Sequence, residues 1–207
     1  MNHVQEILPG LFHWVTFHEG IGQDVHSYYI ATSRPPVLID PRVPDDGLEW
    51  FEGRPRPAHI YLTNRLHYRH SNRFGKRFGA TVWCHRAGLH HFSQRRPVKA
   101  FEHGDVLPGG ITALPVGVLC PEETALFWPA DGGVILIGDA IIRDDTQLDF
   151  VPDGLMGEDP EAVKRGLRAA FKRHLSLAFD NLLFAHGHPW IGGAKAALAS
   201  FLGAAGR

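Results

Sequence analysis

The sequence predicts a mixed α/β (α+β) fold in which two β-sheets pack face to face and helices cover the outside. Short apolar runs separated by Gly, Pro and Asp fill the first third of the chain, as expected of strands joined by hairpins. Helical patterns follow these strands, and the same succession recurs in the second half. The 207 residues are enough for one domain with two pseudo-equivalent halves, about 1–108 and 109–207.

In the first half, β-rich runs bounded by turn residues predict strands over residues 4–8, 11–17, 26–32, 36–39, 58–63 and 81–84. Short helices are expected over 44–51, which has an acidic first turn, and over 86–92. A further helix is expected over 71–78, because Phe74 and Phe78 are spaced four apart and share one face.

In the second half, apolar runs predict strands over residues 111–118, 124–128, 134–137 and 182–185. The strongest helix of the chain is expected over 160–175. Pro160 and Glu161 suit its first turn, and Lys172 and Arg173 suit its last turn. An Ala-rich helix over 193–202 is expected to end the fold, and its apolar surface could form a homodimer.

Composition and charge exclude several classes of function. A formal net charge of -1 gives no electrostatic reason for a nucleic-acid partner, so a nuclease is the weakest hypothesis. Two cysteines are too few for a disulfide framework, and Cys84 is expected in the core. No apolar run is long enough to cross a bilayer, and the first residues lack a secretory pattern, so we expect no membrane partner and a cytoplasmic location. Fourteen histidines justify a search for metal ligands.

Polar residues that suit a metal site follow four apolar strands. Asp40 follows the run 37–39, and a loop with His67 and His70 follows the run 58–62. Gly138-Asp139 follows the run 135–137, and His186 follows the run 182–185. Because each motif stands at a strand end, the four together are more specific than any one of them.

These four segments, in this order, resemble the metallo-β-lactamase fold superfamily, whose histidine loop reads His-x-His-x-Asp-His. When His67 and His70 are aligned with the second and third histidines, Arg65 replaces the first histidine and Arg69 replaces the aspartate. The chain therefore resembles a divergent member with a degenerate motif. The resemblance covers nearly the whole chain and implies a four-layer αββα sandwich with a metal site at one rim between the sheets.

The resemblance also implies a role for each matching residue. His67 corresponds to a ligand of a first metal, His70 and His186 to ligands of a second, and Asp139 to a carboxylate that bridges both. His70, Asp139 and His186 would form a competent set for one divalent ion, either zinc or iron. Asp40 is assigned by position to a residue that anchors the histidine loop. Cys120 is the residue nearest to the position of a further ligand histidine that the central block of this chain lacks.

The two arginines oppose metal binding. At an effective dielectric constant near 20, a guanidinium about 4 Å from a dication costs roughly 8 kcal/mol. We therefore expect Arg69 either to turn away or to pair with Asp139 in place of an ion. Arg65 and Arg69 could also hold an anionic ligand through paired hydrogen bonds.

Two functions from different classes follow. The first is a one-metal hydrolase of an ester, thioester or amide of a small anionic substrate, with Asp139 and Arg69 as catalytic residues. The second is a metal-free, catalytically silent protein that binds a small anion or another partner. Tyr68 and His188 lie beside the motifs, and the sequence is compatible both with a contact to the substrate and with a structural role for them. Glu122 and Glu123 are expected in a solvated turn.

Overall fold

The chain folds around two β-sheets in a computed structural model that describes residues 3–144 and 146–204. The first sheet has seven strands in sequence order, and β4 to β7 run parallel to one another. Its strands are β1 (Gln5–Leu8), β2 (Leu11–His18), β3 (Gln23–Ile30), β4 (Val37–Ile39), β5 (His59–Tyr61), β6 (Thr81–His85) and β7 (Val98–Phe101).

The second sheet has six strands in the order β15-β14-β11-β10-β9-β8, and β11 and β14 are its parallel pair. Its strands are β8 (Val106–Leu107), β9 (Ile111–Pro115), β10 (Thr124–Trp128), β11 (Val134–Ile137), β14 (Asn181–Phe184) and β15 (Trp190–Ile191). A separate hairpin, β12 (Ile141–Asp144) and β13 (Gln147–Phe150), follows β11.

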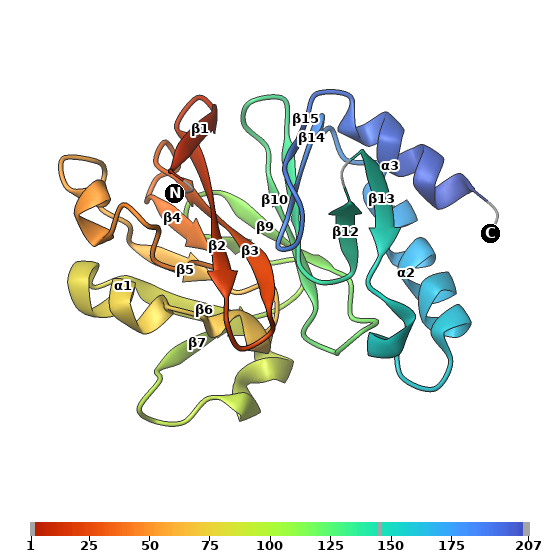
Figure 1. Cartoon of the computed structure of the whole chain (residues 1–207), viewed down its shortest axis with the longest axis horizontal. Coiled ribbons are helices and arrows are strands. Elements are labelled where there is room, and N and C mark those ends of the chain that lie inside the picture. Colours follow the sequence, from red (N-terminus) through yellow and green to blue (C-terminus); the bar gives the residue numbers. More distant parts are fainter. Residues whose placement is uncertain (1–2, 145, 205–207) are drawn as a thin grey trace.

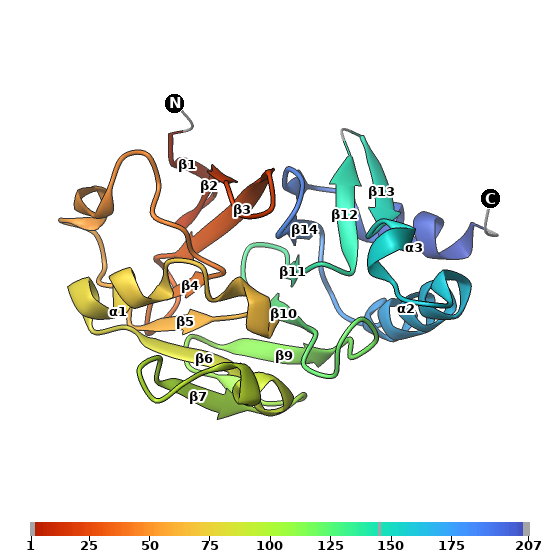
Figure 2. The same ribbon diagram turned by 60° about the horizontal axis from the view of Figure 1, so that its bottom comes forward.

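Helices lie on the outer side of each sheet (Figure 1). Helix α1 (Ser71–Phe78) covers the first sheet, whereas α2 (Pro160–His174) and α3 (Ala194–Gly203) cover the second. Figure 2 shows the same arrangement from another side, with the sheets between α1 and the α2–α3 pair. Short 3-10 helices complete the chain, namely η1 (Leu48–Phe51), η2 (Arg65–Tyr68), η3 (Arg86–His91) and η4 (Asp153–Leu155).

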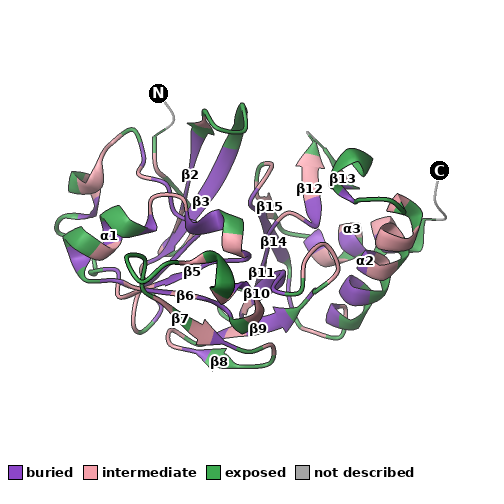
Figure 3. Ribbon diagram, turned by 90° about the horizontal axis from the view of Figure 1, so that it is seen from below, coloured by how far each residue is buried: buried purple, intermediate pink, exposed green. Residues whose placement is uncertain are grey.

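Three hydrophobic clusters hold these four layers together. The central cluster joins inward residues of both sheets, such as Tyr28 and Ile39 with Leu126 and Leu136. The other two pack the outer face of each sheet against its helices. Figure 3 shows this distribution, with buried strands in the middle and exposed surface on the outer helices and loops. The predicted αββα sandwich is therefore confirmed.

Most of the expected elements are present, with differences where local signals are weak. Helix α2 begins as predicted, with Asp159 Oδ1 accepting a hydrogen bond from Ala162 N at 2.9 Å. The helix expected over 44–51 shrinks to η1. The sequence patterns missed β7, β8, β15 and the β12–β13 hairpin, which are short and pair with neighbours that periodicity alone does not reveal. No helix of the described residues has the length and hydropathy to span a membrane.

Tyr28 joins the two sheets through a buried hydrogen-bond pair. Its hydroxyl donates to Phe184 O at 2.7 Å and accepts from Phe184 N at 3.1 Å. Strand β15 pairs only with Asn181 and Leu182 of β14, so this hydroxyl serves backbone groups that β15 does not reach. The Tyr28 hydroxyl therefore supplies the hydrogen-bond partners that a further strand would supply to Phe184.

Tyr28→Phe is expected to lower the free energy of unfolding by about 2–4 kcal/mol, because two buried backbone groups lose their partner. Chemical denaturation measures this loss. Tyr68→Phe is the matched control: Tyr68 is buried, but its hydroxyl makes no hydrogen bond with the described residues, so the change should stay within about 0.5 kcal/mol. Equal effects of the two substitutions would contradict the bridging role.

Candidate metal centre

The polar residues of the site follow the carboxyl ends of parallel strands. Asp40 follows β4, and the loop with Asn64 and His67 follows β5. Across the gap between the sheets, Asp139 follows β11 and His186 follows β14. Since β4 and β5 are parallel and β11 and β14 are parallel, each pair of strands delivers its residues to one edge.

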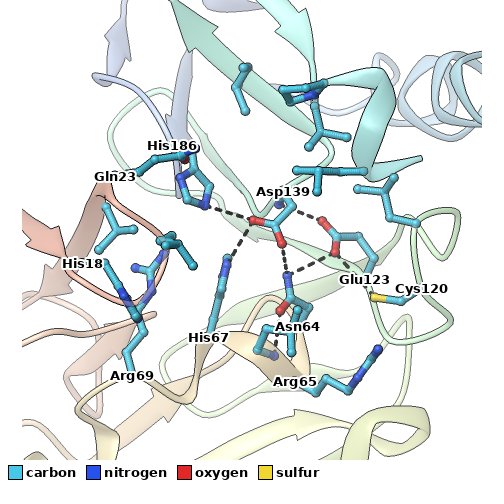
Figure 4. A pocket seen from close by; sticks show the side chains of 18 residues that line it. His18, Gln23, Asn64, Arg65, His67, Arg69, Cys120, Glu123, Asp139 and His186 are labelled. Atoms are coloured by element: carbon cyan, nitrogen blue, oxygen red, sulfur yellow. Dashed lines mark hydrogen bonds and ion pairs between the residues drawn. The ribbon is translucent and has the colours of Figure 1, made fainter. Parts of the chain in front are cut away.

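His67, Asp139 and His186 converge on one point (Figure 4). The Nε2 atoms of His67 and His186 each lie 3.1 Å from Asp139 Oδ1. The three candidate ligand atoms all lie within 4.8 Å of one another, and no other such group of three occurs among the residues that the structure describes. Two imidazoles and one carboxylate at this spacing fit a divalent ion with open positions.

Asp40 fixes the orientation of the His67 ring. Its Oδ2 accepts hydrogen bonds from His67 Nδ1 at 2.9 Å and from the Thr63 hydroxyl at 2.6 Å. Its Oδ1 accepts from Thr63 N at 3.0 Å. The carboxylate is buried, with 2 % of the residue exposed. Asp40 therefore directs His67 Nε2 toward Asp139, as the sequence had predicted for a residue that anchors the loop.

The charges within the group depend on one another. Burial alone would lower the pKa of His67, but Asp139 and Asp40 raise it to about 9. Burial alone would raise the pKa of Asp139, but His67 and His186 hold it far below its usual value. Without another cation, His67 is therefore an imidazolium between two carboxylates, and a bound ion would take over that charge.

Glu123 and Asn64 hold Asp139 from the other side. Glu123 Oε1 accepts from Asp139 N at 3.0 Å and from Ala140 N at 3.2 Å. The Asn64 amide donates to Asp139 Oδ2 at 2.9 Å and to Glu123 Oε2 at 3.3 Å. Burial, followed by the charge of Asp139, raises the pKa of Glu123. Of these two carboxyl groups, Asp139 is therefore the one that stays ionised.

The solvated turn predicted for Glu122 and Glu123 is wrong, since each residue is only 1 % exposed. Glu122 forms a short ion pair with Arg65, and Glu123 lies under the Asp139 loop. Two adjacent glutamates in a Pro-containing turn resemble a surface feature, because their partners are far away in the sequence. Asn64, not Arg65, reaches Asp139 from the start of the histidine loop.

Arg69 turns toward backbone oxygen atoms. Its Nη1 donates to His26 O and to Asp40 O, each at 2.7 Å, and among the described residues Arg69 forms no ion pair with Asp139. Its Nη2 is buried and has no hydrogen-bond partner among the described residues. Burial lowers the pKa of the guanidinium, whereas Asp40 and Asp139 oppose this effect. The expected alternative of a direct Arg69–Asp139 pair is therefore not what the structure contains.

The structure does not bring every predicted residue to the group. His70 was expected beside Asp139, but its Nδ1 accepts a hydrogen bond from Val43 N at 3.0 Å. Arg69, between the histidine loop and α1, has a positive φ of 42°. The candidate ligands that the structure groups are thus His67, Asp139 and His186, whereas the sequence pattern had grouped His70 with the last two.

The remaining candidates lie around the site. Cys120 lines the cavity, its Sγ is 3.8 Å from Glu123 Oε2, and burial raises the pKa of its thiol. Tyr68 packs against Phe92 with ring centroids 5.7 Å apart. His188 is exposed, and its ring contacts that of His26 edge-on at 5.2 Å.

A cavity of about 690 Å³ opens over the group. The tip of the β2–β3 hairpin forms one wall, and β12 with the segment up to η4 forms another. Its floor contains His67, Asp139 and His186, so a bound molecule would contact them directly. A volume of this size is within the range of small-molecule sites.

A buried histidine pair lies beside the site. His13 Nε2 and His26 Nδ1 are 2.8 Å apart, and the two rings stack with centroids 5.0 Å apart. Burial, reinforced by His188, lowers the pKa of His13 to about 4. Burial and the neighbouring His13 lower the pKa of His26 as well. Both rings are therefore neutral in the folded protein at pH 7 and share one proton between two nitrogens.

This pair makes the stability depend on pH. In the unfolded chain His13 binds a proton below about pH 6.5, whereas in the folded chain it does so only below about pH 4. The free energy of unfolding therefore decreases as the pH falls from 6.5 to 4. His13→Gln should reduce the slope of unfolding free energy against pH by about 1.4 kcal/mol per unit. Urea denaturation between pH 7 and 4.5 tests this, and identical slopes in both proteins would contradict it.

Comparison with known proteins supports the fold. No protein-family model matches the chain, and no curated protein sequence matches it. A metallo-beta-lactamase from Pontibacter korlensis is similar with a TM-score of 0.70 and 15% identity, over 98% of this chain and 97% of that one. A protein solved in a di-iron-bound form has a TM-score of 0.65 and 24% identity, over 88% and 96%.

A third similar structure is the flavodiiron protein from Giardia intestinalis, with a TM-score of 0.67 and 17% identity. The match covers 96% of this chain but 58% of the flavodiiron protein. Together these structures show that the chain has the metallo-β-lactamase fold, as the four sequence motifs had predicted.

Proposed function

We propose that this metallo-β-lactamase-fold chain is a one-metal hydrolase that cleaves an ester, thioester or amide of a small substrate with an anionic group. The observation that carries the proposal is the convergence of His67 Nε2 and His186 Nε2 on Asp139 Oδ1 at the floor of a cavity. A zinc or iron ion is the cofactor that these ligand types suit. When bound, such an ion polarises a carbonyl group and makes water a nucleophile at neutral pH.

The surrounding residues support a metal site. His67 has its second nitrogen on the buried Asp40 carboxylate, which is the arrangement that orients an imidazole ligand. Asp139 has its second oxygen on Asn64, so the first oxygen keeps its direction. His186 Nδ1 is buried and has no hydrogen-bond partner among the described residues, which leaves Nε2 as its interacting atom.

The hydrolysis that we propose uses the chain to hold the reactants. Asp139 orients the attacking water through its fixed carboxylate, and the positive charge of Arg69, which lines the cavity, attracts the anionic group of the substrate. The oxygen of water joins the acyl carbon, the bond to oxygen, sulfur or nitrogen breaks, and the proton of water leaves with the departing group.

Arg69 favours one ion over two. Asp40 and Asp139 lie close enough to its guanidinium to raise the pKa of Arg69, and the guanidinium neutralises part of their charge. A second dication would add repulsion to a buried cation. One similar structure was solved with two irons, so the fold itself accommodates metals. We assign a single ion here because this chain supplies its own second positive charge.

The second candidate function is a metal-free protein that binds a small anion. The specific observation in its favour is the raised pKa of His67, to about 9, which provides an internal cation between Asp40 and Asp139. In that case the two carboxylates are already neutralised. Metal binding at the group separates the two functions directly.

The test compares His186, which the structure places in the group, with His70, which only the sequence pattern assigned to it. After loading with zinc and extensive dialysis, the wild-type protein should retain about one ion per chain by mass spectrometry, whereas His186→Asn should retain none. His70→Asn is the matched control, because the asparagine oxygen can still accept from Val43 N and His70 is outside the group. It should keep the ion and should hydrolyse an aryl acetate as the wild type does.

Loss of the ion in both variants, or in neither, would contradict the ligand set. Failure of the wild-type protein to retain zinc or iron would favour the metal-free function. Asp40→Asn tests the anchor separately, and its metal affinity should fall about 10–100-fold because the His67 ring loses its fixed acceptor. Isothermal titration with zinc measures this change, and an unaltered affinity would mean that Asp40 serves the fold alone.

A further inference from the structure

Three exposed aliphatic side chains gather at the mouth of the cavity. Ile21 is 52 % exposed, Leu66 is 62 % exposed and Leu155 is 71 % exposed. They come from three separate segments, namely the turn between β2 and β3, the histidine loop, and η4. The described residues include six exposed large hydrophobic side chains, and these three all line the same cavity. Apolar side chains that meet at one opening from distant parts of the chain indicate a binding surface.

The apolar surface continues from the mouth into the cavity. Four further apolar residues line it, namely Val25, Leu119, Ile142 and Val151. Polar residues also line the cavity, among them His18, Gln23 and Arg65. A molecule that reached the His67–Asp139–His186 group would therefore have a long apolar part in contact with aliphatic side chains.

We propose that the cavity takes an aliphatic acyl chain, so that the substrate is a medium-chain acyl ester or thioester whose carbonyl lies over the His67–Asp139–His186 group. The reaction rests on the proposed function, but the chain-binding surface rests on the cavity alone. The acyl carbonyl occupies the floor, the alkyl chain contacts the walls, and its end lies between Ile21, Leu66 and Leu155. Hydrolysis releases the fatty acid and an alcohol or thiol.

The test uses the zinc-loaded protein and p-nitrophenyl esters of acetate, butanoate, hexanoate and octanoate. Each methylene that enters an apolar site should raise kcat/KM about fourfold until the cavity is full. Binding of the free acids by isothermal titration gives a readout without catalysis, and octanoate should bind more than about tenfold more tightly than butanoate.

A pair of double variants identifies the surface. Leu66→Ser/Leu155→Ser replaces two exposed side chains at the mouth, and both the slope of kcat/KM and the preference for octanoate should fall. Val106→Ser/Ile191→Ser is the matched control, because it also replaces two exposed aliphatic residues but neither lines the cavity. The control should keep the chain-length dependence of the wild type.

The outcomes distinguish this inference from the proposed function. Hydrolysis with no dependence on chain length would overturn the acyl-chain site and leave the hydrolase. Chain-length-dependent acid binding that is lost in Leu66→Ser/Leu155→Ser, with no hydrolysis of any ester, would support the site and overturn the hydrolase. A dimer that this variant dissociates in sedimentation experiments, without any chain-length dependence, would show that a second copy covers the mouth and would overturn the inference.

Discussion

The buried Asp40 carboxylate is the constraint on which the arrangement of the site depends. It follows β4 with a φ of 46°, and its oxygen atoms accept from Thr63 and His67 on the next loop. Its backbone oxygen accepts from Ser27 of β3 and from Arg69. Burial would raise its pKa, but His67, Arg69 and Thr63 hold the pKa below its usual value. Asp40 thus holds Thr63 and the histidine loop through its carboxylate, and Ser27 and Arg69 through its backbone oxygen.

The site balances its charges in a way that sets its chemistry. Asp40 and Asp139 are held ionised, whereas burial and the charge of Asp139 favour the protonated form of Glu123. Arg69 and a protonated His67 supply the matching positive charge in the protein alone. An ion that displaced the His67 proton would change the net charge of these four groups from 0 to +1, whereas two ions would change it to +3. The smaller excess of positive charge is the reason why we propose one ion rather than two.

The sequence predicted the layers and the strand ends well, because both follow from local patterns. Apolar runs placed β4, β5, β11 and β14, and the polar residues after them were correctly located at strand ends. The direction of a side chain within a loop is not a local property, so His70 was assigned to a group that it does not join. His70 instead contacts Val43 N, which is 27 residues away in the sequence, so no local pattern predicts this contact.

Glu123 shows a second limit. Its burial depends on Asn64, which is 59 residues away, and on the backbone after β11. In the sequence, two adjacent glutamates in an exposed turn look the same as two buried glutamates that hold a candidate metal ligand. The short β12–β13 hairpin was missed for a related reason, although Ile142 on β12 forms part of the cavity wall. The motifs located the site, whereas its supports and its apolar wall required the tertiary structure.

The most direct test of the account is a crystal structure of the zinc-loaded protein with anomalous diffraction data collected at the zinc edge. We predict one anomalous peak per chain, bonded to His67 Nε2, Asp139 Oδ1 and His186 Nε2, with His70 still on Val43 N and Arg69 still on the backbone oxygens of His26 and Asp40. A second peak beside Arg69, a peak ligated by His70, or no peak at this group would contradict it.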